Sequence, residues 1–290
     1  MLRFFASIAL ALSAAAPQEG SAPRATPASS PREHLAPFFS RAVADPAGVV
    51  PLILEGSAAL ATLAGRDEAE ARLLAETLEP YSARAFFSPE RLPRMEELGL
   101  ALHTVRPGEV PERIVRRYRT GAGMLAYLNA GYDERRLREG QTLKVLDLSG
   151  GGLKIRVQRG AYRLSVHRTL PGGGSALVLC VPVGLGAADS PTPLGETSIT
   201  ARVRNPEWTD PVTKQVFAPG DPGNVLGGYW IALDGEGLGR KGIGLHGFTG
   251  EVAAKWIEQP ASHGCVRMLQ RDIDRVFQVA IEGTPVSIEP

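Results

Sequence analysis

Ala261-Ser262-His263-Gly264-Cys265-Val266-Arg267-Met268 is the most informative stretch of this chain, because it places a cysteine directly after a His-Gly pair. A second histidine, His246, lies a short distance upstream. The 290 residues include only two cysteines and five histidines. Three of these seven side chains, His246, His263 and Cys265, fall within twenty residues of one another. A cysteine attacks as a thiolate, and a nearby histidine can take the thiol proton. The stretch therefore predicts an activated nucleophile at Cys265.

Gly264 suits such a site as well. A residue without a Cβ lets the backbone turn tightly and approach a substrate closely. We expect the backbone N–H groups of His263, Gly264 and Cys265 to converge on one oxygen and stabilise its negative charge. Thiol, base and amide donors suffice for this chemistry, so we expect no metal and no organic cofactor.

The same side chains have two alternative uses. The second cysteine, Cys180, lies in the apolar run 176–181 and is interpreted as a small core residue. A Cys180–Cys265 disulfide would instead remove the nucleophile. His246, His263 and Cys265 also form an incomplete zinc set, because structural zinc usually takes four protein ligands.

The composition is that of an ordinary soluble globular protein, with 43% hydrophobic and 22% charged residues. The formal net charge of +1 gives no electrostatic case for nucleic acid or an acidic membrane surface as a partner. The length allows one large domain or two to three smaller ones.

Residues 1–16 have the outline of a secretory signal peptide, with a positive start at Arg3, an apolar run over 4–12 and small residues over 13–16. The apolar run is too short for a comfortable membrane span. We expect export to the periplasm or cell envelope, with no stable membrane span after cleavage; an uncleaved anchor is the alternative. Residues 17–32 are rich in Pro, Ser and Ala and are predicted to be a disordered linker.

Residues 33–100 are predicted to be helical. Ala69, Leu74 and Leu78 recur at helix spacing between charged residues. Prolines are expected to cut the region into short pieces, and they stand at positions 37, 46, 51, 80, 89 and 93. No catalytic pattern occurs here, and the sequence does not distinguish a small helical module from a spacer.

Residues 101–148 follow the order strand, helix, helix, strand. Residues 103–109 and 138–143, with Asn129 between them, resemble a LysM domain, the small module that binds glycans containing N-acetylglucosamine. Pro111 departs from that family, which usually has an apolar residue before its first helix. The resemblance implies glycan strands as a partner; a purely structural βααβ module is the alternative.

After the glycines at 150–152 the pattern becomes that of a β domain with one or two helices. Short segments alternate polar and apolar residues between glycine turns, at 153–157, 162–166, 176–183, 198–203, 229–233, 243–245 and 285–288. One helix is predicted over 269–281, where apolar side chains share a face. The fold class is therefore mixed and mostly β, with the β domain over residues 152–290.

His246-Gly247, followed by the Ser262-His263-Gly264-Cys265-Val266-Arg267 stretch, resembles the signature of YkuD-type L,D-transpeptidases, which remodel bacterial peptidoglycan. Further segments resemble the same family, at 190–199, 205–208, 219–227 and 283–286. The resemblance implies a β-sandwich-like catalytic domain. Leu194, Ser198 and Trp256 depart from the family pattern, so the lid and the acceptor preference are not carried over.

The resemblance also implies a role for each matching residue. Cys265 is the nucleophile that forms a thioester, and His246 is the proton donor and acceptor, with its ring oriented by the backbone carbonyl of Gly247. Arg267 holds a carboxylate of the stem peptide, since a guanidinium pairs with such a group through two hydrogen bonds. The oxyanion and substrate pocket is shaped by Ser262, His263 and Gly264.

By the same resemblance, Cys265 attacks a peptidoglycan tetrapeptide stem, releases D-alanine and transfers the acyl group to an amine, forming 3→3 crosslinks for cell wall biogenesis and cell shape. Carbapenems would inhibit such an enzyme covalently. Water as the acceptor would make it an L,D-carboxypeptidase, and a protein lysine would give attachment to peptidoglycan. A Cys/His wall endopeptidase and a non-catalytic wall-binding protein are the remaining alternatives.

Overall fold

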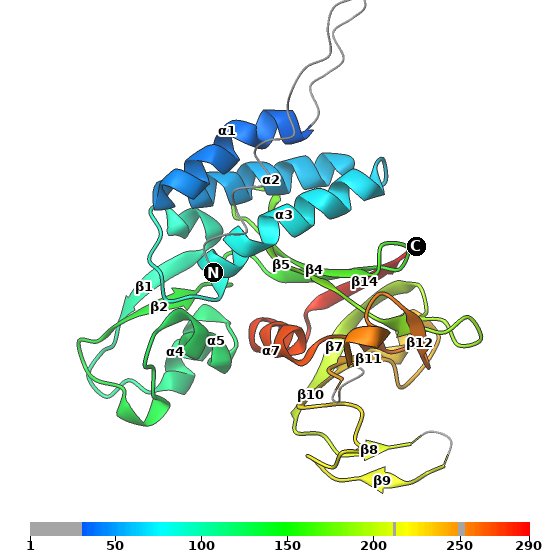
Figure 1. The fold of residues 1–290 in the computed structure, drawn as a ribbon. Helices are drawn as coiled ribbons and strands as arrows, with labels where there is room; N and C mark the ends of the chain where they lie inside the picture. The colour runs from blue at the N-terminus through cyan, green and yellow to red at the C-terminus, as the bar shows by residue number, and fades with distance from the viewer. Residues whose placement is uncertain (1–30, 211–212, 249–252) are drawn as a thin grey trace, which may run out of the picture.

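The computed structural model describes residues 31–210, 213–248 and 253–290 (Figure 1). The expected signal peptide, residues 1–16, and the expected linker up to residue 30 lie outside the described residues. The first helix, α1, covers Pro31–Ala44, so the last two residues assigned to the linker are helical.

Three helices form the N-terminal layer: α1, α2 (Val49–Leu63) and α3 (Glu68–Phe86), with short 3-10 turns η1 (Pro46–Gly48) and η2 (Met95–Leu98). The predicted helical region is confirmed. The expectation that the prolines cut this region into short pieces is wrong at two of them, because Pro37 lies inside α1 and Pro80 inside α3. A proline removes one helical hydrogen bond. Packing of α3 against α2 and the sheet compensates for that loss.

This helical layer shares one hydrophobic core with the large sheet rather than forming a separate domain. Leu52 and Leu78 belong to the same buried cluster as Val178 of strand β5 (Ser175–Pro182). In the described residues one helical segment, Pro46–Leu63, is long and apolar enough to cross a membrane. Half of it is buried inside the protein, as the core helix of a globular protein would be.

Two buried hydroxyls attach the layer to the edge of the sheet. Strand β5 ends the strand order, and an edge strand exposes unpaired backbone groups. Ser82 of α3 donates to the Leu177 carbonyl at 2.7 Å, and the Leu177 amide donates to Ser57 of α2 at 2.8 Å. The helices therefore complete the hydrogen bonding of β5 as well as covering it.

Residues 101–148 fold in the predicted βααβ order, here called the βααβ module. Its elements are β1 (Leu100–Thr104), α4 (Pro111–Tyr118), α5 (Ala122–Leu128) and β2 (Thr142–Leu146), with η3 (Glu134–Arg136) before β2. Strands β1 and β2 are antiparallel, and the module has a small core of its own. Pro111 is the first residue of α4, where a missing N–H costs no helical hydrogen bond.

A buried lysine fixes this module to the helical layer. The Lys144 Nζ donates to the carbonyl oxygens of Ala85, Ser88 and Glu90 at 2.8, 3.0 and 2.6 Å, at and beyond the end of α3. These carbonyls would otherwise lack partners. Burial lowers the pKa of Lys144 to about 8.

The β domain is built on one eight-stranded sheet with the order β13-β11-β10-β7-β14-β3-β4-β5. The expected strands are confirmed, but they join one curled sheet and not two sheets of a sandwich (Figure 1). Their bounds are β3 Leu153–Gln158, β4 Arg163–Thr169, β7 Gly195–Arg204, β10 Tyr229–Leu233, β11 Gly244–His246, β13 Val266–Arg267 and β14 Pro285–Glu289.

Shorter elements complete this domain. Helix α7 (Gln270–Val279) confirms the predicted helix, and α6 (Gly235–Leu238) is a single turn. Strand β6 (Leu185–Gly186) pairs with β12 (Pro260–Ser262), and β8 (Trp208–Thr209) pairs with β9 (Val216–Phe217) in a projecting hairpin (Figure 1). The turn η4 covers Ala253–Trp256. The sequence did not predict β6, β8, β9 and β12, because their two or three residues show no clear alternating pattern.

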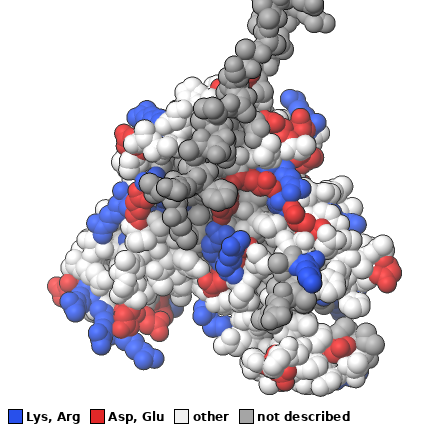
Figure 2. Space-filling model, in the orientation of Figure 1, with Lys and Arg blue, Asp and Glu red and all other residues white. Residues whose placement is uncertain are grey.

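Charged side chains of both signs are interspersed on the face shown in Figure 2, with no field of a single sign. This distribution agrees with the net charge of +1. It gives that face no electrostatic preference for a polyanion.

Candidate active site

The pairing of two short strands brings the signature residues together. Strands β11 and β13 run parallel, with Leu245 opposite Val266 and His246 opposite Arg267. Cys265 directly precedes β13, and the Met268 amide donates to the His246 carbonyl at 2.9 Å. The predicted base therefore ends one strand, and the predicted nucleophile directly precedes the neighbouring strand of the same sheet.

His246 is buried, with 3% of its surface exposed, and its ring has a defined orientation. Its Nδ1 lies 2.5 Å from the Gly247 carbonyl oxygen. Because a carbonyl only accepts, Nδ1 carries the proton, which leaves Nε2 with a free lone pair. The Trp230 ring lies beside the imidazole, with ring centroids 5.9 Å apart. Burial lowers the pKa of His246 to about 4, so the ring is neutral at pH 7.

The Cys265 side chain is half-buried, and its thiol donates to the Gly242 carbonyl at 3.5 Å. Burial raises the pKa of this thiol, while the Gly244 backbone and the charges of Arg267 and Arg240 act in the opposite direction. Both groups are therefore neutral at rest, with the imidazole at the end of β11 and the thiol just before the neighbouring strand β13.

Ser262 holds the turn that presents the thiol. It is buried, and its Oγ donates to the Cys265 carbonyl at 2.6 Å and accepts from the Gly264 amide at 3.1 Å. The Gly264 amide therefore already has a partner within the turn. This differs from the expectation that the amides of His263, Gly264 and Cys265 converge on one oxygen. Neither the His263 amide nor the Cys265 amide is recorded with a backbone partner outside strand pairing among the described residues, so these two are the donors of this turn best suited to an oxyanion.

Gly264 cannot be replaced without strain. Its φ is +103°, which side chains rarely adopt. A Cβ there would lie 3.0 Å from both Arg240 Nη1 and Ile243 Cδ1. The side chain of His263, by contrast, is exposed. The backbone carbonyl of His263 accepts a hydrogen bond from Arg240.

Arg240 is a site residue that sequence reasoning missed. Its Nη2 donates to Ser190 Oγ at 2.8 Å and to the His263 carbonyl at 3.0 Å, and its Nη1 lies 3.4 Å from the Pro191 carbonyl. It therefore ties the loop at 190–191 to the turn that carries the thiol. It lies in a glycine-rich turn outside any motif, so no sequence signal identified it.

Arg267 provides a half-buried cation with unused hydrogen-bonding capacity. Its guanidinium lies 5.1 Å from the Phe248 ring centroid and 5.6 Å from that of Trp256, and Nη1 donates to the Ala261 carbonyl at 3.2 Å. Its Nε and the Trp256 Nε1 are both buried without a partner. No carboxylate of the described residues pairs with it. Such a group fits the carboxylate of a ligand.

The two cysteines are separate free thiols, so the disulfide alternative is wrong for this structure. Cys180 is buried in β5, as expected of a core residue, and burial raises its pKa to about 12. Cys265 is the more exposed of the two and remains available as a nucleophile.

Cys265, His246 and the half-buried Arg267 thus lie on two short paired strands and the turn before one of them. Residues 155–288 match the family model of the YkuD L,D-transpeptidase catalytic domain. Residues 155–288 are therefore similar to the catalytic domain of YkuD-type L,D-transpeptidases, and this similarity supports an enzyme of this kind. His246 and Cys265 both lie inside the matched residues.

Individual relatives agree with this family. YqjB of Bacillus subtilis is 34% identical over 106 residues, which are 37% of this chain and 56% of that protein. YkuD of Bacillus licheniformis is 26% identical over 194 residues, 66% of this chain and 100% of that protein. Both bear L,D-transpeptidase names.

A solved structure, L,D-transpeptidase 3 of Mycobacterium tuberculosis with a faropenem-derived adduct, is 13% identical. The match covers 53% of this chain and 76% of that chain, with a TM-score of 0.36. At that score the likeness adds nothing to the family match.

Proposed function

We propose that this chain is an exported enzyme that crosslinks peptidoglycan by L,D-transpeptidation. The observation that carries the proposal is the half-buried Cys265 directly before the strand that pairs with that of the buried His246, with Arg267, whose Nε has no partner, on the same strand. The family match supports the chemistry in its coarser form, acyl transfer by a cysteine.

In the proposed first step, His246 Nε2 takes the Cys265 proton as the sulfur attacks the carbonyl carbon of the third stem residue. The Cys265 amide stabilises the oxyanion, and Arg267 holds a stem carboxylate. When the tetrahedral intermediate collapses, the imidazolium returns its proton to the leaving amine, and D-alanine departs. Cys265 then holds the tripeptide as a thioester.

In the second step, an acceptor amine attacks the thioester and loses a proton to His246. The new amide bond is the 3→3 crosslink, and the thiolate regains its proton from the imidazolium. Water as the acceptor would make the product a free tripeptide, and a lysine of another protein would make it a protein–peptidoglycan link. The thioester is common to all three outcomes.

We also propose that the βααβ module binds glycan strands. Next to β1 the module has a cavity of about 730 Å³, lined in part by Arg106, Arg117 and Glu139. His103 and Glu109 beneath it are buried and paired at 2.8 Å, and Tyr118 lies 3.1 Å from the other ring nitrogen of His103. This network supports a preformed wall for the cavity. Export to the periplasm follows from the same proposal, since peptidoglycan lies there.

The decisive experiment incubates the purified chain with disaccharide-tetrapeptides and weighs the products. Loss of D-alanine with formation of dimers is expected for the wild type, and Cys265→Ala should abolish both. Cys180→Ala is the matched control, because it removes the buried thiol and should keep the activity. Turnover by Cys265→Ala would overturn the mechanism.

The same assay separates the alternatives. Tripeptide without dimers would indicate a carboxypeptidase, and cleavage elsewhere in the stem an endopeptidase. A carbapenem should add its intact mass at Cys265, because a thiolate opens a strained β-lactam. Binding to sacculi without turnover and without an adduct would indicate a wall-binding protein.

A further inference from the structure

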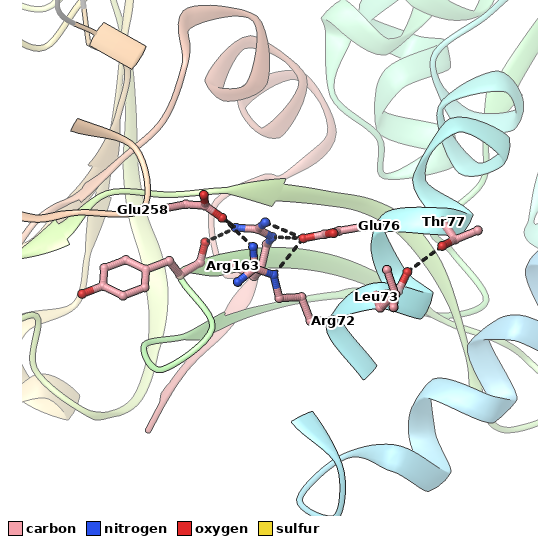
Figure 3. A network of polar contacts seen from close by, with 7 residues as sticks. Arg72, Leu73, Glu76, Thr77, Arg163 and Glu258 are labelled. Atoms are coloured by element: carbon pink, nitrogen blue, oxygen red, sulfur yellow. Dashed lines mark hydrogen bonds and ion pairs between the residues drawn. The ribbon is translucent and has the colours of Figure 1, made fainter. Parts of the chain in front are cut away.

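Four charged side chains join helix α3 to strand β4 and to the segment that carries Glu258 (Figure 3). Arg72 and Glu76 come from α3, Arg163 from β4, and Glu258 from the segment between η4 and β12. Arg72 contacts Glu76 at 2.9 Å and Glu258 at 2.7 Å. Arg163 donates to Glu76 through Nε at 2.9 Å and makes a second, shorter bond to it through Nη2. Its Nη1 pairs with Glu258.

The network is more than a set of surface ion pairs. The Arg163 side chain is only 8% exposed, and it contacts both carboxylates at once. A buried cation depends on its partners, whereas an isolated pair on the surface contributes little. Since Glu76 and Glu258 share Arg163 and Arg72, helix α3 and the segment at Glu258 are held at a fixed spacing.

The backbone of Glu258 has an unfavourable conformation that contacts from other elements stabilise. Its φ is +58°, in the left-handed region that a glutamate seldom occupies. Its amide donates to the Val183 carbonyl at 3.0 Å, and the next residue, Gln259, accepts from the Leu185 amide at 3.0 Å. Arg72 of α3 and Arg163 of β4 both pair with the Glu258 carboxylate, and these contacts stabilise this backbone conformation.

Glu258 is connected to Arg267 through Trp256. The Trp256 carbonyl packs so closely on Gly184 that a Cβ there would lie 2.1 Å from its oxygen. Gly184 and Arg267 exchange two backbone hydrogen bonds, at 2.9 and 2.8 Å. The Trp256 ring also lies against the Arg267 guanidinium. A shift of Glu258 would therefore move the ring and the backbone that define the surroundings of Arg267.

We propose that helix α3 is a positioning element of the active site, which places Trp256 and Arg267 for substrate through the Arg72–Glu76–Arg163–Glu258 network. The N-terminal helices are then part of the catalytic unit and not a spacer. The choice of substrate in this inference rests on the proposed function. The contacts that link α3 to Arg267 do not depend on it. The shared core and the two serine contacts to β5 keep α3 fixed relative to the sheet, which such a role requires.

The test uses the full chain with Arg72→Met and Glu258→Gln, both of which leave Cys265, His246 and Arg267 intact. We expect KM for the tetrapeptide to rise about tenfold, the size of coupling carried by a packed network. The kcat and the rate of Cys265 alkylation by iodoacetamide should stay near wild type. Arg72→Lys should restore most of the loss in KM. Arg94→Met is the matched control, since the ion pair that Arg94 makes among the described residues is the exposed one with Glu97 of η2.

Amide hydrogen exchange over residues 255–262 gives a second readout that needs no substrate. Both variants should exchange faster there while β5 exchanges at the wild-type rate. Wild-type exchange and wild-type KM in both variants would overturn the proposal. So would a fall in thermal stability with kcat and alkylation declining together, because that pattern indicates general destabilisation. If the wild type fails to convert tetrapeptide, the proposed function fails and the exchange result still decides this inference.

Discussion

At the scale of single residues, the main result is that the predicted nucleophile and base are both neutral at rest. Burial lowers the pKa of His246 to about 4 and raises that of Cys265. The Gly247 carbonyl fixes the proton on Nδ1, which leaves Nε2 as the only ring atom that can act as a base. At neutral pH the resting site therefore holds a thiol and a neutral imidazole.

Arg240 should influence that transfer. Its charge acts to lower the pKa of Cys265. Arg240→Met should therefore raise the pKa of the thiol, moving the midpoint of iodoacetamide alkylation to higher pH and slowing alkylation at pH 7. Arg240→Lys should keep the midpoint near the wild-type value. Lys241→Met removes a neighbouring exposed charge and should leave it unchanged. Equal midpoints for Arg240→Met and wild type would rule out this electrostatic role.

At the scale of elements, the structure depends on side chains that join one element to the next. Ser57 and Ser82 complete the backbone bonds of β5, and Ser262 closes the turn before β13. Nothing in the sequence distinguishes these serines from ordinary polar residues. Their partners are backbone groups, and those of Ser57 and Ser82 lie on a distant segment. Their hydrogen bonds explain why polar groups are buried here.

Lys144 is the element-scale contact with the largest expected effect on stability. Lys144→Met keeps the apolar stem but leaves the Ala85, Ser88 and Glu90 carbonyls unpaired. We expect the free energy of unfolding, measured with urea, to fall by about 1–3 kcal/mol. Lys154→Met, which removes a lysine with a 44% exposed side chain, should change it little. A Lys144→Met protein as stable as the wild type would contradict this account.

At the scale of the whole molecule, the helices, the large sheet and α7 share one core, and stability should therefore respond to groups buried throughout it. Burial lowers the pKa values of His246 and His167 to about 4 from an ordinary 6.5. Between these values the unfolded chain binds more protons than the folded one. Stability is therefore complete above pH 6.5 and falls as the pH drops toward 4.

We therefore expect the Tm to decrease by several degrees between pH 6.5 and 5, above the range in which carboxylates titrate. His167→Gln should make this decrease smaller, and His34→Gln, which changes an exposed ring, should not. Thermal unfolding followed by circular dichroism checks both. A Tm that is constant over this range in the wild type would show that the buried rings do not control acid stability.

Much of the fold was predictable because it follows from local pattern. The helices of residues 33–100, the βααβ order and strands such as Tyr229–Leu233 agree with the periodicity of their own residues. The prolines at 37 and 80 were misjudged, since packing with distant elements outweighs one lost helical hydrogen bond. Strands such as Val266–Arg267 were missed because two residues carry no period.

The sequence by itself determined the residue types of the site: a thiol after His-Gly, a second histidine before Gly247, and an arginine two positions beyond the thiol. Those choices are local and can be read along the chain. Only the tertiary structure decided that Arg240 belongs to the site, that the Gly264 amide is already used, and that Glu258 is gripped from α3. These facts depend on burial and on contacts between distant segments, which form only when the strands pair and the helices pack.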